Sequence, residues 1–211
     1  MQDYYAARAN EYDRIYLKPE RQADLRQIEG WLPTVFAGRS VLELACGTGY
    51  WTQFYAPAAE RVVAVDAAPE TLRIAETRVP AAKVQLVEGD AYRLPSSTVR
   101  CDAGFAGFWW SHIPRSRIDE FLCGFHAAIG PGAKVVFLDN RFVAGSSTPI
   151  AESDAEGNTY QVRTLADGST HRVLKNFPDR DALMAFVAPH AASIEYREWQ
   201  YFWALEYTTR V

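Results

Sequence analysis

The sequence predicts an α/β protein built around a doubly wound, mostly parallel sheet. Short runs that are almost wholly apolar, typical of strands buried on both faces, alternate with segments of helical periodicity. Strands that alternate with helices form right-handed βαβ units. The runs expected as strands are residues 41–45, 62–65, 84–87, 101–105 and 135–138.

Two helices between these runs are marked by their ends as well as by their period. Residues 69–79 begin with Pro69 and place apolar side chains on one side, and residues 114–129 carry apolar side chains at helical spacing. Proline is favoured in the first turn of a helix. The stretch 130–132, Gly-Pro-Gly, is a stop signal.

The remaining segments complete a single domain around a core at 39–139. Residues 1–36 predict an N-terminal helical cap, and residues 140–177 predict an insertion that contains a hairpin with a turn at Asp167-Gly168. Residues 178–211 predict a last helix and two strands. Because insertions of this kind often cover active sites, we expect the polar run 145–158 to act as a lid, together with residues 5–16 of the cap, which carry tyrosines on one helical face.

Composition excludes several classes of protein. The chain has 211 residues, a formal net charge of -4 and no run of Lys or Arg, so we expect no nucleic-acid partner. Its three cysteines form no C-x-x-C pair, and no His/Asp/Glu triplet has ligand spacing, so we expect no metal. No apolar run is long enough to span a bilayer, and no signal-peptide core is present. We therefore expect a cytoplasmic protein without a membrane partner.

The most informative stretch joins the first strand to a turn with two glycines. Gly47 and Gly49 suit a turn in which a ligand approaches the main chain, and the following helix start offers free N–H groups. The stretch reads Val41-Leu42-Glu43-Leu44-Ala45-Cys46-Gly47-Thr48-Gly49-Tyr50. Dinucleotide-binding turns place a third Gly or Ala where this chain has Thr52, so that fingerprint is incomplete.

Three acidic residues accompany the turn. Asp66 ends the next strand, 19 positions beyond Gly47, where a carboxylate binds ribose hydroxyls. Glu43, within the first strand, favours an ammonium group and would repel a pyrophosphate. Asp90, after the third strand, suits an adenine amino group.

These pieces resemble the class I S-adenosylmethionine (SAM)-dependent methyltransferases in order and spacing over about residues 39–139. The matching stretches are E-L-A-C-G-T-G, V-V-A-V-D, E-G-D-A and G-P-G-A-K-V-V-F. The resemblance implies a seven-stranded sheet, with the last strand antiparallel, and SAM as the cofactor. It places the cofactor against Glu43 (indirectly), Gly47, Gly49, Asp66, Ala67, Asp90, Ala91, Phe105, Tyr5 and Tyr12.

Residues just after the fourth strand are candidates for the substrate pocket, because ligands of such sheets lie at the strands' carboxyl ends. Trp109 and Trp110 suit pocket walls, and His112 suits a general base, with a helix cap as its alternative role. His171, in the hairpin, suits a further polar contact.

The sequence therefore predicts in-line methyl transfer from SAM to a nitrogen or oxygen of a small molecule, without a metal. Methylation of a nucleic-acid base is disfavoured, since Gly107-Phe108-Trp109-Trp110 stands where base-methylating members often carry Asn- or Asp-Pro-Pro-Tyr. An NAD(P)-dependent oxidoreductase is one alternative, and a non-catalytic SAM-binding regulator is another. The identity of the substrate and the oligomeric state stay open.

Overall fold

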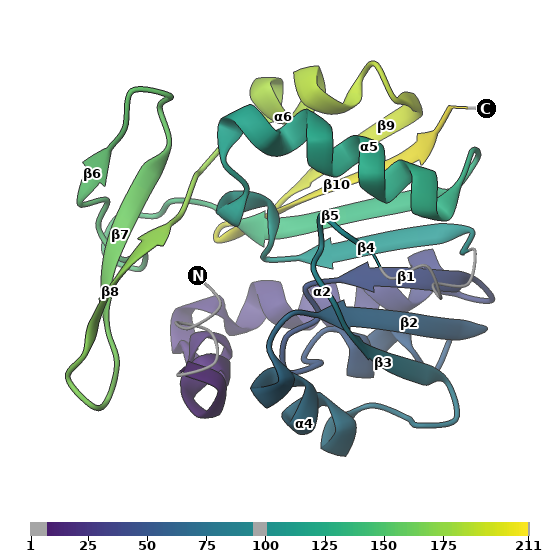
Figure 1. Cartoon of the computed structure of the whole chain (residues 1–211), viewed down its shortest axis with the longest axis horizontal. Coiled ribbons are helices and arrows are strands. Elements are labelled where there is room, and N and C mark those ends of the chain that lie inside the picture. Colours follow the sequence, from purple (N-terminus) through teal and green to yellow (C-terminus); the bar gives the residue numbers. More distant parts are fainter. Residues whose placement is uncertain (1–7, 95–100, 211) are drawn as a thin grey trace.

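The chain folds around a seven-stranded sheet (Figure 1). The computed structural model describes residues 8–94 and 101–210. The strand order is β3-β2-β1-β4-β5-β10-β9. The strands are β1 (Ser40–Leu44), β2 (Arg61–Asp66), β3 (Val84–Glu88), β4 (Ala103–Gly107), β5 (Lys134–Asn140), β9 (Ala191–Glu198) and β10 (Phe202–Thr209). The first five are parallel, and β10 runs antiparallel to β5 and β9. The predicted fold class is confirmed.

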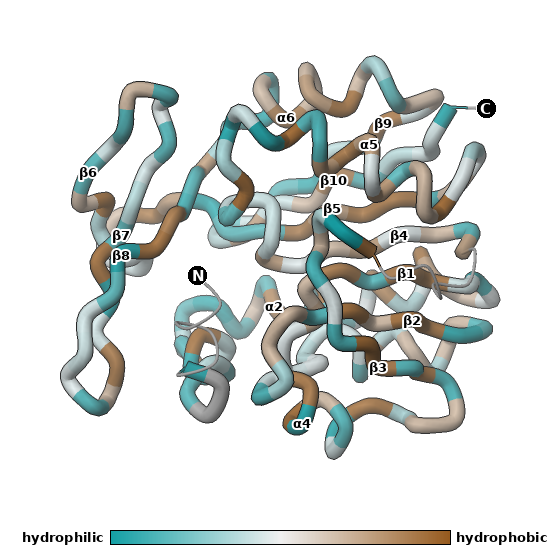
Figure 2. Tube along the Cα trace, in the orientation of Figure 1, coloured by the Kyte–Doolittle hydropathy of each residue, from teal (hydrophilic) through white to brown (hydrophobic). Residues whose placement is uncertain are grey.

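Helices cover both faces of the sheet, because its strands are apolar on both sides (Figure 2). The helices are α2 (Gln22–Phe36), α3 (Thr52–Tyr55), α4 (Pro69–Arg78), α5 (Ile118–Ile129) and α6 (Arg180–Val187). Within β5, Val136 packs in the core on the α2 and α3 side, while Val135 and Phe137 pack with α5 and α6. This alternation follows from the two-residue period of a strand.

Two elements begin later than the sequence predicts. β4 spans Ala103–Gly107 and so begins and ends two residues later than expected. Its pairing with β5 runs from Ala103 opposite Lys134 to Gly107 opposite Leu138. α5 begins at Ile118, since two short 3-10 turns, η3 (Trp110–His112) and η4 (Arg115–Arg117), occupy the stretch after β4. Both shifts bring residues 107–112 to the carboxyl edge of the sheet.

The N-terminal segment and the insertion lie together beyond that edge (Figure 1). The first contains 3-10 helices η1 (Ala9–Leu17) and η2 (Pro19–Arg21), so the predicted leading helix is a 3-10 helix over its described part. The insertion forms a separate antiparallel sheet of β6 (Glu152–Ser153), β7 (Thr159–Thr164) and β8 (Thr170–Leu174). The predicted hairpin is confirmed. Among the described residues, no helix is long and apolar enough to cross a membrane.

Candidate functional site

Two cavities meet at the carboxyl ends of the parallel strands. The first, of about 380 Å³, is here called the glycine-turn cavity. Apart from Tyr12 of η1, its lining comes from the ends of β1 to β4 and the segments after them: Ala45, Gly47, Asp66, Ala67, Ala68, Thr71, Gly89, Asp90, Ala91, Tyr92, Gly107, Phe108, Trp109, His112 and Arg117.

The second, of about 390 Å³, is here called the hairpin cavity. It is lined by side chains of 8–21, of 140–148, and of β7 and the segment after β8. Tyr12, Phe108 and His112 line both cavities, so these three residues form the junction between them.

The backbone at the glycine-turn cavity adopts conformations that are unusual for residues with a Cβ. Ala45 and Phe108, at the ends of β1 and β4, have φ values of 54° and 60°. Gly47 has φ of 55°, and a Cβ built there would meet open space. Such backbone conformations cost free energy and cluster at ligand sites. The empty space over Gly47 allows a ligand to approach the main chain, as the sequence predicts.

Asp66 lines the cavity and also supports the glycine turn. Its carboxylate accepts hydrogen bonds from the backbone N–H of Gly47 at 2.8 Å and of Ala68 at 2.9 Å, and from the hydroxyl of Thr71 at 3.0 Å. Burial raises the pKa of this carboxyl, and the hydrogen bonds oppose the rise. Asp90 lies farther along the same wall, with Ala67 and Ala91.

Two predicted cofactor contacts lie behind this cavity. A Cβ at Gly49 would lie 2.9 Å from Cγ1 of Val79, so this glycine permits close packing of the turn against α4. Glu43 is buried and accepts hydrogen bonds at 2.7 Å from the hydroxyls of Thr52 and Tyr55. Burial raises its pKa to about 7. Glu43 therefore joins β1 to α3, and any action on a ligand is indirect.

Phe105, which the resemblance places against the cofactor, does not line the glycine-turn cavity. Phe105 is fully buried on the α2 and α3 side, where it packs against Phe36 and Tyr55. Because β4 continues to Gly107, the cavity wall comes from Gly107 and Phe108 instead. The expected strand end was two residues too early, and no local signal marks the true end, since the apolar residues Phe108 to Trp110 follow Gly107 directly.

The two neighbouring tryptophans have different surroundings. Trp109 lines the glycine-turn cavity and packs against Tyr92. Trp110 is 1% exposed and packs against Phe137 and Trp203 on the α5 and α6 side of the sheet. The expectation of a pocket wall at Trp110 is therefore wrong, because consecutive residues of the chain face different ways.

The N-terminal segment covers the glycine turn. The hydroxyl of Thr48 donates to Asp13 at 2.7 Å, and Arg78 of α4 pairs with the same carboxylate. Tyr16 stacks on Tyr50, with ring centroids 3.4 Å apart. Tyr12 lines both cavities, whereas the predicted contact Tyr5 lies outside the described residues.

His112 stands at the junction as a neutral imidazole. Its Nδ1 lies 2.6 Å from the carbonyl oxygen of Leu174. Because a carbonyl only accepts, Nδ1 carries the proton and Nε2 has the lone pair. Burial, followed by the charges of Lys175 and Arg163, holds the pKa of His112 well below 6.5. The alternative role of His112, a helix cap, is not what the structure shows, because the bond runs to the end of β8.

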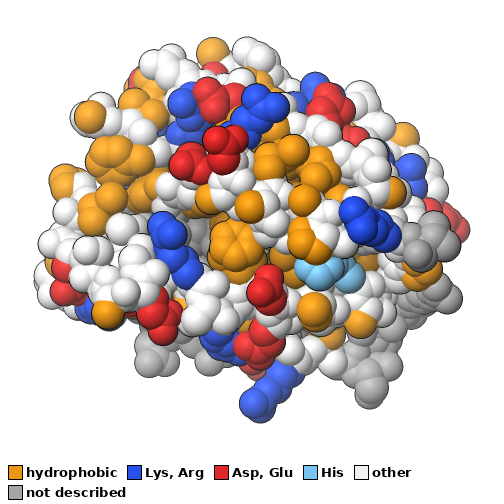
Figure 3. Space-filling view, turned by 90° about the horizontal axis from the view of Figure 1, so that it is seen from above, with side chains coloured by type: hydrophobic (Ala, Val, Ile, Leu, Met, Phe, Trp, Pro, Cys, Tyr) orange, Lys and Arg blue, Asp and Glu red, His pale blue; other side chains and the backbone are white. Residues whose placement is uncertain are grey.

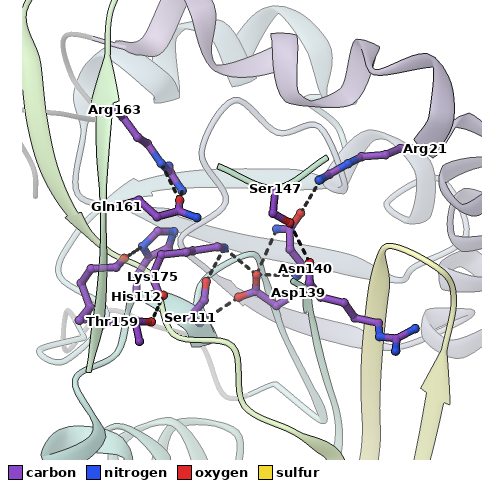
Figure 4. A network of polar contacts seen from close by, with 12 residues as sticks. Arg21, Ser111, His112, Asp139, Asn140, Ser147, Thr159, Gln161, Arg163 and Lys175 are labelled. Carbon is purple, nitrogen blue, oxygen red and sulfur yellow. Dashed lines mark hydrogen bonds and ion pairs between the residues drawn. The ribbon is translucent and has the colours of Figure 1, made fainter. Parts of the chain in front are cut away.

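A buried ion pair lies beside His112, and the sequence analysis missed it (Figure 4). Nζ of Lys175 lies 2.9 Å from Oδ1 of Asp139 and also donates to the hydroxyl of Ser111. Asp139, at the end of β5, accepts from the backbone N–H of Ser111 at 2.9 Å. Burial raises the pKa of Asp139, but the charge of Lys175 and the hydrogen bonds from Ser111 and Lys175 outweigh it, so the pKa is lowered. This network ties the hairpin to the carboxyl ends of β4 and β5.

The hairpin contributes Gln161, Arg163 and Lys175 to its cavity rather than the predicted His171. His171 faces Arg163 across the hairpin, interacts with Ser169 at 3.1 Å and lines neither cavity. The polar contact predicted at His171 is therefore provided by Arg163, its cross-strand neighbour.

Comparison with known proteins covers both the core and the whole chain. The model of a methyltransferase domain matches residues 41–132. A malonyl-[acyl-carrier protein] O-methyltransferase of Serratia marcescens is 26% identical over 165 residues, which are 70% of this chain and 61% of the relative. A demethylmenaquinone methyltransferase of Paenarthrobacter aurescens is 32% identical over 107 residues, 50% of this chain and 40% of the relative. The chain thus spans about half the length of these curated relatives.

A solved structure extends the likeness to the insertion. The DhpI–SAM–HEP complex superposes with a TM-score of 0.78 and 27% identity, covering 97% of this chain and 94% of that one. A protein similar to this chain over nearly its full length, including its N-terminal segment and hairpin, therefore binds SAM.

Proposed function

We propose that this chain is a class I SAM-dependent methyltransferase that transfers the methyl group to a nitrogen or oxygen of a small molecule held in the hairpin cavity. The observation that carries this proposal is the junction. Among the described residues, two cavities of similar volume share a short boundary of Tyr12, Phe108 and His112. A cofactor in one and an acceptor in the other would meet at these three residues.

The residues of the glycine-turn cavity suit the cofactor. Asp66 and Asp90 offer carboxylates to ribose hydroxyls and to an adenine amino group, and the open space over Gly47 admits a ligand to the main chain. Tyr92 and Trp109 add aromatic walls suited to a flat base. When bound, SAM supplies an electrophilic methyl group on a positively charged sulfur.

Transfer requires alignment and exclusion of water more than strong acid–base help. The acceptor's lone pair forms a bond to the methyl carbon as the carbon–sulfur bond breaks, which leaves a neutral thioether. Tyr12 and Phe108 wall the junction and restrict water. Where the acceptor is a hydroxyl or an amine, Nε2 of His112 accepts the proton that it loses.

The size of the hairpin cavity supports a small acceptor, because 390 Å³ lies near the lower end of the range of roughly 300–1,000 Å³ found for ligand pockets. The names of the curated relatives include an O-methyltransferase, in keeping with an oxygen acceptor. Transfer of labelled methyl from SAM to a panel of small alcohols, amines and acids tests the proposal. Binding of the demethylated product, S-adenosylhomocysteine (SAH), without transfer to any acceptor would favour a non-catalytic SAM-binding regulator.

The role of His112 is tested by a substitution that keeps its structural bond. In His112→Asn, the side-chain N–H can still reach the Leu174 carbonyl, but no ring nitrogen faces the junction. If His112 accepts a proton, turnover falls by about 100-fold or more while SAH affinity and melting temperature stay near wild type. A normal rate in His112→Asn would remove His112 from the reaction and leave positioning alone.

A further inference from the structure

The hairpin cavity is far more basic than the rest of the chain. Although the chain's net charge is -4, the described residues that line the cavity include one carboxylate, Glu11, and six cationic side chains: Arg8, Arg14, Lys18, Arg21, Arg163 and Lys175. On the face that Figure 3 shows, acidic and basic side chains lie interspersed with apolar ones. The positive charge is therefore gathered in the cavity by the fold.

Two of these cations are neutralised within the protein. Arg14 lies 3.3 Å from Glu11, and Lys175 is paired with Asp139 at 2.9 Å. Among the described residues, no second carboxylate lines the cavity, so cationic side chains outnumber acidic ones there. An anionic ligand would add counter-charge to this cluster.

Arg21 shows the need for such a counter-charge most clearly. Its side chain is 6% exposed, and its hydrogen bonds go to neutral oxygens of Asn140 at 2.9 Å and of Ser146 at 3.1 and 3.4 Å. Among the described residues, no carboxylate lies within ion-pair distance of Arg21, although Glu20 and Asp24 favour its charge from farther away. Burying a charge without a close partner is costly.

Arg163 brings a second guanidinium to the cavity from the hairpin (Figure 4). Its Nε and Nη2 donate to Oε1 of Gln161 at 3.2 and 2.8 Å, and Nε2 of Gln161 donates to the carbonyl of Thr148 at 2.6 Å. These bonds orient the planar fork, which suits carboxylate and phosphoryl oxygens. The charge of Arg163 also helps to lower the pKa of Lys175 and of His112, which shows that the cations repel one another.

We propose that the acceptor is a small anion, carrying a carboxylate or phosphoryl group that Arg21 and Arg163 bind within the hairpin cavity. The inference rests on the proposed function, because it names the class of molecule that occupies the acceptor site. Arg21 and Ser146 line only the hairpin cavity, whereas Tyr12, Phe108 and His112 line both. The anionic group is thus anchored away from the junction, and the rest of the molecule extends toward it.

The test uses the full chain saturated with SAH, titrated by calorimetry with inorganic phosphate, with acetate and with glycerol. We expect phosphate or acetate to bind and glycerol not to bind, and the better of the two anions identifies the group. Arg163→Gln should weaken anion binding about tenfold or more, since it removes a charged hydrogen-bond donor. Arg8→Gln, which changes a lining residue of the N-terminal segment, should also weaken it.

Arg172→Gln is the matched control, because Arg172 lies on the same hairpin, is half-exposed, pairs with Glu152 and does not line the cavity. Melting temperature and SAH affinity confirm that each variant is folded. Anions that bind no better than glycerol, or that lose affinity equally in Arg172→Gln and Arg163→Gln, would overturn the inference. If the wild-type chain does not bind SAH, the proposed function is instead refuted.

Discussion

Glu43 makes the stability of this fold depend on pH in a direction opposite to that of most carboxylates. Burial raises its pKa to about 7, from 4.5 for an ordinary glutamate. Between these two values, the folded chain keeps a proton on Glu43 that the unfolded chain releases. Because the folded state then binds more protons, the free energy of unfolding falls as pH rises from about 4.5 to about 7.

The expected loss follows from the two pKa values. Their difference of about 2.5, at about 1.4 kcal/mol for each pKa unit, corresponds to about 3 kcal/mol. Glu43→Gln removes the titration and keeps an oxygen that accepts from Thr52 and Tyr55, both of which bond to the same carboxylate oxygen. The stability of the variant relative to wild type should therefore rise by about 3 kcal/mol between pH 4.5 and pH 8.

Urea unfolding of both proteins at several pH values measures this change. A constant offset between them, such as the cost of the buried amide, cancels from the pH dependence. Glu88→Gln serves as the control, because Glu88 is exposed at the end of β3, which pairs with β2. The pH dependence of its stability should follow that of wild type. If the difference in unfolding free energy between Glu43→Gln and wild type does not change over this pH range, Glu43 does not titrate as its burial requires.

Three further outcomes are expected at the glycine turn and the segments that cover it. Asp66→Asn should weaken SAH binding about tenfold or more, measured by calorimetry, and unchanged affinity would contradict a contact with the ribose. Gly47→Ala should abolish SAH binding with about 1–2 kcal/mol of destabilisation from its φ of 55°, whereas Gly49→Ala should cost more stability because its Cβ would meet α4. Residues 9–17 and 145–158 should gain hydrogen-exchange protection with SAH, and equal protection with and without it would refute their role as lids.

Local patterns in the sequence predicted the sheet because they reflect burial on both faces. Val135, Val136 and Phe137 pack against different layers, and an unbroken apolar run is the mark of that arrangement. The end of β4 was less predictable, since Phe105 and Phe108 are both aromatic and both buried. Pairing of Gly107 with Leu138, a contact with another strand, decides which of the two faces the cavity.

The charge of the hairpin cavity is a property that no local pattern carries. Its cations come from the N-terminal segment and from a hairpin more than a hundred residues later, and the buried partner of Lys175 is 36 residues away at Asp139. Counted along the chain, these basic residues look scattered, and a net charge of -4 argues against an anionic partner. Folding changes that conclusion locally, because it places Arg21 and Arg163 around one small cavity and leaves most of the acidic residues elsewhere. For a small acceptor, the charge that matters is that of the cavity, so a composition that disfavours a nucleic acid still allows a small anion.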